Sequence, residues 1–190
     1  MINIFITSYP YVYERYFKVF DYFKDKACLI FILPRKWRAR SGWLTPPVRG
    51  DIRILPTRAF FYGSKYPIIR GLLKGWMPAT GHLLRARAKK GDILYTAIEP
   101  NLLTTLWNSY YAKRHGLRHV FFTWQNVPYR KRLHGLKLHI TEWIVRHVIR
   151  NSIGVICGNE KAAALMREYA PQNFKILRVP ISGVDTNLFQ

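Results

Sequence analysis

Residues 155–189, VICGNEKAAALMREYAPQNFKILRVPISGVDTNLF, decide how the rest of the chain is interpreted. Apolar runs, helical spacing and the Gly158-Asn159 pair divide the stretch into a strand, a turn, a helix and a second strand: residues 155–157, 158–159, 162–169 and 174–179. Pro171 ends the helix, and a loop starting at Pro180 follows the second strand. This is a strand–helix–strand unit, and an open parallel sheet binds its ligands outside the carboxyl ends of its strands.

The same alternation runs through the preceding residues. Short apolar runs predict five further strands, at residues 2–7, 27–33, 51–56, 93–97 and 117–123. Helical spacing predicts helices at 13–23, in much of 63–90, at 102–115 and at 136–150, while 34–50 is predicted to be irregular. Strands that alternate with helices predict an α/β fold with a doubly wound, Rossmann-like parallel sheet. We expect one domain over residues 1–180, with 181–190 beginning a linker.

Composition limits the class of protein. With 190 residues and 49% hydrophobic residues, the chain can bury a core and is not disordered. The two cysteines, Cys28 and Cys157, fall in predicted buried strands and are interpreted as core thiols. No apolar run is long enough to span a bilayer, and the first residues lack the basic region of a signal peptide. A cytoplasmic protein is therefore expected.

Charge is the strongest global signal. Lys and Arg number 31 against 10 Asp and Glu, which gives a net charge of +21. Such a surface suits an anionic membrane, nucleic acid or a phosphorylated substrate. The segment 34–50 mixes cations with tryptophans, as membrane-surface segments do, and the candidate membrane-surface residues are Arg35, Lys36, Trp37, Arg38, Arg40 and Trp43. A surface loop pinned by its aromatic residues explains the same pattern equally well. Nucleic acid is the less favoured partner, because no recognised binding motif is present.

Polar residues follow three of the predicted strands: Glu99, the pair Gln125-Asn126, and the pair Asn159-Glu160. A carboxylate at the end of a buried strand can have a shifted pKa and can act in acid–base chemistry. The alternative for Glu99 is a first-turn acid of the following helix, and for Glu160 this alternative is preferred. Gln125 and Asn126 can only hydrogen-bond a ligand. No dinucleotide, P-loop or nucleophile-elbow motif is present, and the histidines lack metal-ligand spacing, so neither a cofactor nor a metal is expected.

Together, these residues resemble a known family. The closing stretch with Gly158-Asn159-Glu160 and Gly183-Val184-Asp185, Glu99-Pro100 after a strand, and residues 123–126 resemble the N-terminal domain of glycosyltransferase family 4 enzymes, which have the GT-B fold. The resemblance implies a retaining, hexosyl-type glycosyltransferase that uses a nucleotide-sugar donor without a metal. It implies an acceptor side at Glu99, Gln125 and Asn126. It also implies a donor side of the cleft at Ser8, Tyr9, Asn159, Glu160, Ser182 and Gly183.

The chain departs from the family pattern in three places. Gln125 stands where many members have a histidine, and Ser8-Tyr9-Pro10-Tyr11 replaces a Gly-rich loop after the first strand. The family's second, donor-binding domain is not within these residues, so a longer chain or a separate one is expected to carry it. The expected acceptor is a lipid-linked or cell-envelope glycan of polysaccharide biosynthesis, met on the inner face of the membrane. The alternatives are a basic nucleic-acid-binding module and a non-catalytic partner subunit.

Overall fold

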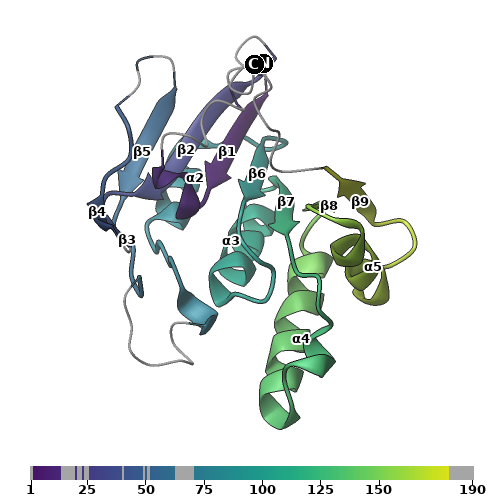
Figure 1. The fold of residues 1–190 in the computed structure, drawn as a ribbon. Helices are drawn as coiled ribbons and strands as arrows, with labels where there is room; N and C mark the ends of the chain where they lie inside the picture. Colours follow the sequence, from purple (N-terminus) through teal and green to yellow (C-terminus); the bar gives the residue numbers. More distant parts are fainter. Residues whose placement is uncertain are drawn as a thin grey trace, which may run out of the picture.

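The computed structural model describes residues 2–13, 20, 23, 26–39, 41–48, 50, 52–62 and 71–179 (Figure 1). Seven parallel strands form one sheet in the order β5-β2-β1-β6-β7-β8-β9. Their bounds are β1 Asn3–Thr7, β2 Cys28–Pro34, β5 Arg53–Thr57, β6 Ile93–Thr96, β7 Arg118–Thr123, β8 Gly154–Cys157 and β9 Lys175–Arg178. The Rossmann-like parallel sheet predicted from the sequence is confirmed. Successive strands are added on one side of β1 as far as β5, and then on the other side from β6 to β9. The direction of strand order therefore reverses between β1 and β6.

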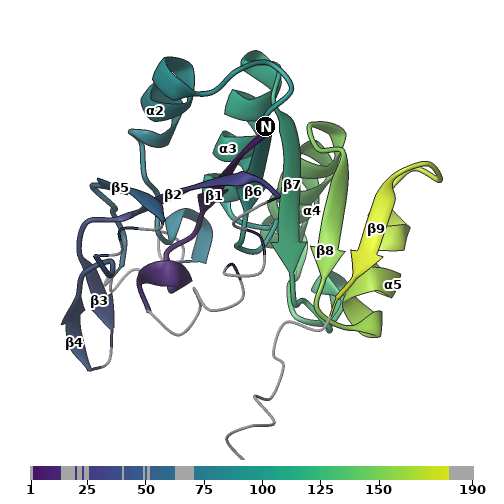
Figure 2. The same cartoon turned by 90° about the horizontal axis from the view of Figure 1, so that it is seen from above.

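Four α-helices are described: α2 Thr80–Arg87, α3 Leu103–Arg114, α4 Gly135–Arg150 and α5 Glu160–Tyr169. α3, α4 and α5 pack in sequence beside one another along the β6–β9 half of the sheet (Figures 1 and 2). Two short 3₁₀ turns, η1 Pro10–Val12 and η4 Tyr129–Lys131, lie in the loops. Within the described residues, no helix is both long enough and apolar enough to cross a bilayer. Most of the helix predicted at 13–23 lies outside those residues, as do 63–70 and 180–190.

The sheet is buried on both faces at β1 and β2, as the continuous apolar run of β2 predicts. Ile30 and Ile32 join a core cluster with Leu84 of α2 and Ala112 of α3. Phe31 and its alternate neighbour Leu33 instead join a second cluster with Ile6. Side chains along β2 therefore alternate between two cores, one for each face of the sheet.

α2 and α3 approach closely because Gly81 has no side chain. A Cβ on Gly81 would lie 2.3 Å from the ring of Tyr111. Any larger residue at this position would push the tyrosine ring out of the core around Leu84.

His119 lies on β7, inside the sheet, and is fully buried. One ring nitrogen lies 2.9 Å from Thr96 Oγ1 on β6, and the other lies 2.7 Å from Ser152 Oγ just before β8. Burial lowers the pKa of His119 to about 3. The imidazole is therefore neutral at physiological pH, and it ties the middle strands together.

Segment 34–50 is not irregular throughout, which corrects the sequence prediction in part. Trp37–Ala39 and Gly42–Leu44 form an antiparallel hairpin, β3 and β4. Gly42 has φ +117°, a conformation that favours glycine. Trp37 is only 6% exposed and stacks on Tyr9 with ring centroids 4.5 Å apart. The surface position predicted for Trp37 is therefore wrong, because the indole anchors the hairpin to the domain.

The helical spacing of residues 136–150 predicts a single apolar face of α4, made of Leu136, Ile140, Trp143, Ile144 and Val148, and this prediction needs correction. Ile144 and Val148 are buried, as expected. Leu136, Ile140 and Trp143, which were assigned to the same face, are 75%, 41% and 53% exposed. Thr141, Val145 and Ile149 complete the buried face instead. α4 thus carries exposed apolar side chains in addition to its buried ones.

Candidate functional site at the carboxyl edge of the sheet

The loops after β1, β6, β7 and β8 meet at the carboxyl edge of the sheet, where the strand arrows in Figure 2 point. This edge includes the place where the strand order reverses, which is the usual ligand position in open parallel sheets. Hydrogen bonds join the loops to one another. Ser8 Oγ donates to Ala97 O at 3.2 Å, and Asn159 Nδ2 donates to Trp124 O at 3.3 Å.

Glu99 is the centre of this network. Thr123 Oγ1 donates to Glu99 Oε2 at 2.6 Å, and the backbone N–H of Trp124 donates to Oε1 at 2.8 Å. Thr105 Oγ1 donates to the backbone carbonyl of Glu99 at 2.7 Å. The side chain therefore spans from the loop after β6 to the loop after β7. It is not a first-turn acid of α3, whose first turn contains no acidic residue.

Burial raises the pKa of the Glu99 carboxyl, while the bonds from Thr123 and Trp124 and the charge of Arg132 oppose the rise. The carboxylate acts on its surroundings in turn. Burial raises the pKa of Tyr9, and the charge of Glu99 raises it further. Burial, and to a smaller extent the charge of Glu99, likewise raise the pKa of Tyr129. A partly buried carboxylate between two phenols and an arginine can accept a hydroxyl hydrogen bond or take up a proton.

The loop after β7 presents three side chains at the edge. Gln125 is partly buried, and its amide donates to the carbonyl of Val127. Its backbone N–H donates to Thr123 Oγ1 at 3.1 Å. Asn126 and Trp124 are exposed. Trp124 and Thr123 were not predicted as site residues, although their position directly before Gln125 offered a signal. An exposed indole at this edge can stack on a sugar or a base.

Asn159 and Glu160 have local roles at the start of α5. Asn159 is the N-cap, and its Oδ1 accepts from Ala162 N at 2.8 Å. Glu160 lies in the first turn, as preferred from the sequence, and pairs with Arg167 at 3.2 Å and also with Arg178. The hydrogen bond from Arg167, followed by that from Arg178, lowers the pKa of Glu160. The two carboxylates of this edge therefore have opposite environments.

The loop after β1 carries Ser8, whose Oγ bonds to Ala97 O, and Tyr9, whose pKa is raised by burial and by the charge of Glu99. Lys74 Nζ lies 4.9 Å from the centroid of the Tyr9 ring. Thr7 at the end of β1 is fully buried, and no described residue accepts or donates a hydrogen bond at its Oγ1. Ser182 and Gly183, the other predicted donor-side residues, lie outside the described residues.

The basic hairpin, which we define as residues 35–44, has most of its cationic side chains at the surface. Arg35, Lys36 and Arg38 are exposed, and Trp43 is 55% exposed while its ring contacts Tyr62 edge-on. Arg40 lies outside the described residues.

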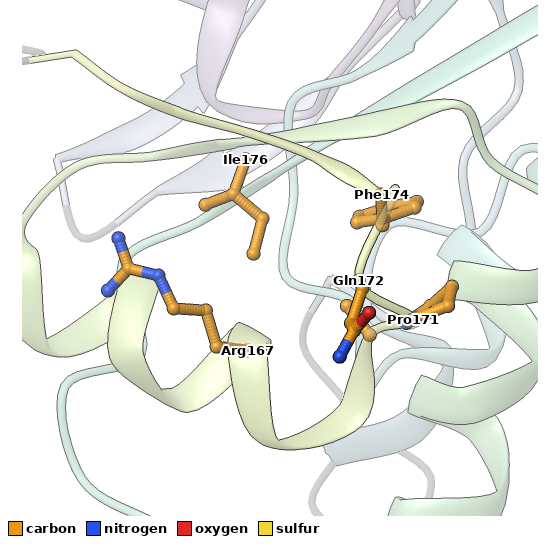
Figure 3. A pocket seen from close by; sticks show the side chains of 6 residues that line it. Arg167, Pro171, Gln172, Phe174 and Ile176 are labelled. Carbon is orange, nitrogen blue, oxygen red and sulfur yellow. The ribbon is translucent and has the colours of Figure 1, made fainter.

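A hollow of about 420 Å³ lies elsewhere, between the end of α5 and the start of β9 (Figure 3). Its lining residues are Arg167, Ala170, Pro171, Gln172, Phe174 and Ile176. Because Phe174 precedes β9, this hollow lies toward the amino end of that strand, away from Glu99. Within the described ranges, no cluster of three or more His, Cys, Asp and Glu side chains could hold a metal ion.

The chain is similar to one solved structure in particular, a crystal structure of Anabaena Alr3699/HepE in complex with UDP. The TM-score is 0.55 at 10% sequence identity, and the match covers all of this chain and 46% of the other. The chain thus spans about half the length of that protein. No family model matches the sequence, and no curated protein does. At this identity the likeness establishes the fold, and it agrees with the Rossmann-like class expected from the sequence.

Proposed function

We propose that the chain forms the acceptor-side half of a glycosyltransferase that transfers a hexose from a nucleotide-sugar donor with retention of configuration. One observation carries the proposal. The carboxyl edge around Glu99 belongs to a sheet that matches part of a protein crystallised with UDP. The remaining part of the donor site is proposed to come from a second domain, in the same chain or in a separate one. No cofactor or metal is required in this proposal.

The proposed acceptor is a lipid-linked or cell-envelope glycan reached at the inner face of the membrane. Each oxygen of Glu99 accepts one hydrogen bond from Thr123 or Trp124, and each retains a second lone pair for an acceptor hydroxyl. Gln125 and Asn126 lie in the next loop and supply amides for the same glycan. Orientation of the acceptor hydroxyl, together with stabilisation of the leaving phosphate, is the main source of rate in such a transfer.

Sugar transfer from a panel of radiolabelled uridine and guanosine nucleotide sugars to envelope lipid extracts tests this proposal. The full protein and its Glu99→Gln variant should be compared, with Glu168→Gln, an exposed carboxylate on α5, as the control. We expect a loss of about 100-fold or more in kcat/KM for Glu99→Gln and little change for the control. Equal activity of Glu99→Gln and the unaltered protein would remove Glu99 from the proposed site.

A further inference from the structure

The outward side of α4 carries large apolar side chains that the described residues leave uncovered. Leu136, Ile140 and Trp143 are 75%, 41% and 53% exposed. Their spacing of four and then three residues places them on one side of the helix. Figure 1 shows the amino-terminal part of α4, which carries Leu136, extending beyond the neighbouring helices.

This stripe is exposed, although it borders the buried side of α4. Ile144, Val145, Val148 and Ile149 form the buried side and pack against the sheet and α5. A helix that only covers a sheet has a single apolar stripe and a polar outer side. The apolar surface of α4 is therefore wider than its buried side, since Ile140 is one turn from Ile144 and is exposed, and exposed apolar surfaces mark interaction sites.

The stripe lies among cations. Lys137, Arg146 and Arg150 are exposed on α4. The one acid of this helix, Glu142, accepts from Arg130 Nε at 3.0 Å and from Tyr169 Oη at 3.1 Å, on the side that faces α5. Arg146 also acts on Glu142 and lies 5.2 Å from the centroid of the Tyr169 ring, so Lys137 and Arg150 are the α4 cations left to border the stripe.

The neighbouring helices extend the same character. α2 and α3 contain no acidic residue, and both carry cations in their last turns: Arg85, Arg87, Lys113 and Arg114. Trp107 and Tyr110 of α3 are exposed, with ring centroids 6.4 Å apart. Tryptophan and tyrosine are enriched at the boundary between acyl chains and headgroups.

We propose that the outward side of α3 and α4 docks on an anionic lipid bilayer, with Leu136, Ile140 and Trp143 entering the headgroup region and the surrounding cations contacting lipid phosphates. An apolar stripe bordered by Lys and Arg is the pattern of a helix lying in a membrane interface. Nucleic acid fits less well, because aliphatic Leu136 and Ile140 add nothing to phosphate contacts or base stacking. The inference rests on the proposed position at a membrane, but it assigns the contact to α3 and α4 and not to the basic hairpin.

Co-sedimentation with vesicles tests the assignment. Phosphatidylcholine vesicles with and without phosphatidylglycerol should be mixed with the chain and with the stripe variant, which combines Leu136→Gln, Ile140→Gln and Trp143→Gln. We expect the chain to bind the anionic vesicles, and the stripe variant to bind them about tenfold or more weakly. A matched control combines Leu177→Gln and Val179→Gln, because Leu177 on β9 and Val179 directly after β9 are both exposed apolar residues. This control should bind normally.

A second measurement reports on insertion without removing the stripe. Brominated lipids quench tryptophans that enter the headgroup region, so Trp143 of α4 and Trp107 of α3 should be quenched, and Trp143→Phe should reduce the quenching clearly. Quenching that is unchanged by Trp143→Phe would contradict the proposal.

Other outcomes separate this inference from the proposed function. Loss of binding in an Arg35→Gln, Lys36→Gln, Arg38→Gln variant, with normal binding by the stripe variant, would overturn the inference and keep the membrane position. Failure of the unaltered chain to bind either kind of vesicle would overturn both the inference and the proposed position at a membrane. Binding to single-stranded RNA but not to vesicles would overturn the inference. The inference would also be overturned if sedimentation velocity showed that the chain is a dimer, and if the stripe variant were monomeric but bound vesicles normally.

Discussion

Glu99 and Glu160 lie at the same edge of the sheet, yet their environments differ in almost every respect. Glu99 is partly buried and receives its hydrogen bonds from neutral donors, Thr123 Oγ1 and Trp124 N. Glu160 is exposed and is held by two arginines on its own helix and on β9. Burial raises the pKa of Glu99, and the arginines lower that of Glu160. Position at the end of a strand therefore does not decide what a carboxylate can do.

The difference separates a binding group from a structural one. A carboxylate whose charge is poorly solvated gains from a ligand that brings a hydroxyl hydrogen bond or a cation. One that already has two arginines gains little from a further partner. The variants below test how far this contrast holds, beginning with the largest expected effect.

Replacing Glu99 by alanine should have the largest effect. The change leaves the Trp124 N–H and the Thr123 hydroxyl without their acceptor, so we expect a loss of about 2–3 kcal/mol in the free energy of unfolding. Urea denaturation measures it. Glu160→Ala is the control and should cost less than half as much as Glu99→Ala. Equal costs for the two variants would show that burial does not distinguish the carboxylates.

Thr123→Val tests the strongest single contact of Glu99. Valine keeps the shape of the buried threonine but removes the donor to Glu99 Oε2, so the expected cost is about 1–2 kcal/mol. The same change should raise the pKa of Glu99 further, because a bond that favours the charged form is lost. Titration of a ¹³C-labelled Glu99 carboxyl by NMR measures the shift. A lowered pKa in the variant would contradict the assigned geometry.

Asn159→Ala tests the Glu160 side of the comparison. The variant loses the N-cap of α5 and the bond to Trp124 O, with an expected cost of about 1 kcal/mol in thermal or urea unfolding. Asn159→Asp is the control and should retain the cap, since aspartate accepts the same bond from Ala162 N. A cost for Asn159→Asp as large as that for alanine would assign the effect to the bond with Trp124.

The smallest expected effect is a difference in pH dependence. The pKa of Glu99 is raised above 4.5 in the folded state, so its contribution to stability falls as the pH rises from 4.5 through the folded pKa. The pKa of Glu160 is lowered, so its contribution is present above 4.5 and is lost as the pH falls through the folded pKa. Unfolding of Glu99→Gln and Glu160→Gln against pH should therefore deviate from the unaltered protein in opposite directions. Deviations of the same sign would contradict the contrast.

The sheet could be predicted from the sequence because strand burial is a local property. Continuous apolar runs such as 27–33 predicted strands that are buried on both faces, and β2 and β8 were found within one residue of the predicted starts. The turn at Gly158-Asn159 and the first-turn position of Glu160 follow from local backbone chemistry in the same way.

What the sequence did not predict depends on contacts between distant residues. Hairpin β3–β4 forms because Trp37 packs on Tyr9, a contact that no local pattern encodes. In α4, the buried and the exposed apolar residues share the same helical spacing. Only the position of the sheet decides that Ile144 is buried and Leu136 is not. The bridge from Glu99 to Thr123 joins residues that are 24 positions apart. Periodicity could place both at one edge but could not pair them.

The buried histidine on β7 has a consequence for the tolerance of this domain to acid. His119 cannot take up a proton while it lies between Thr96 and Ser152, whereas an unfolded chain takes one up near pH 6.5. Stability is therefore lost progressively as the pH falls from about 6.5 toward 3. Mild acid, such as that used to elute proteins from affinity columns, would thus act on the middle of the sheet before it protonates the Glu160 carboxylate at the edge.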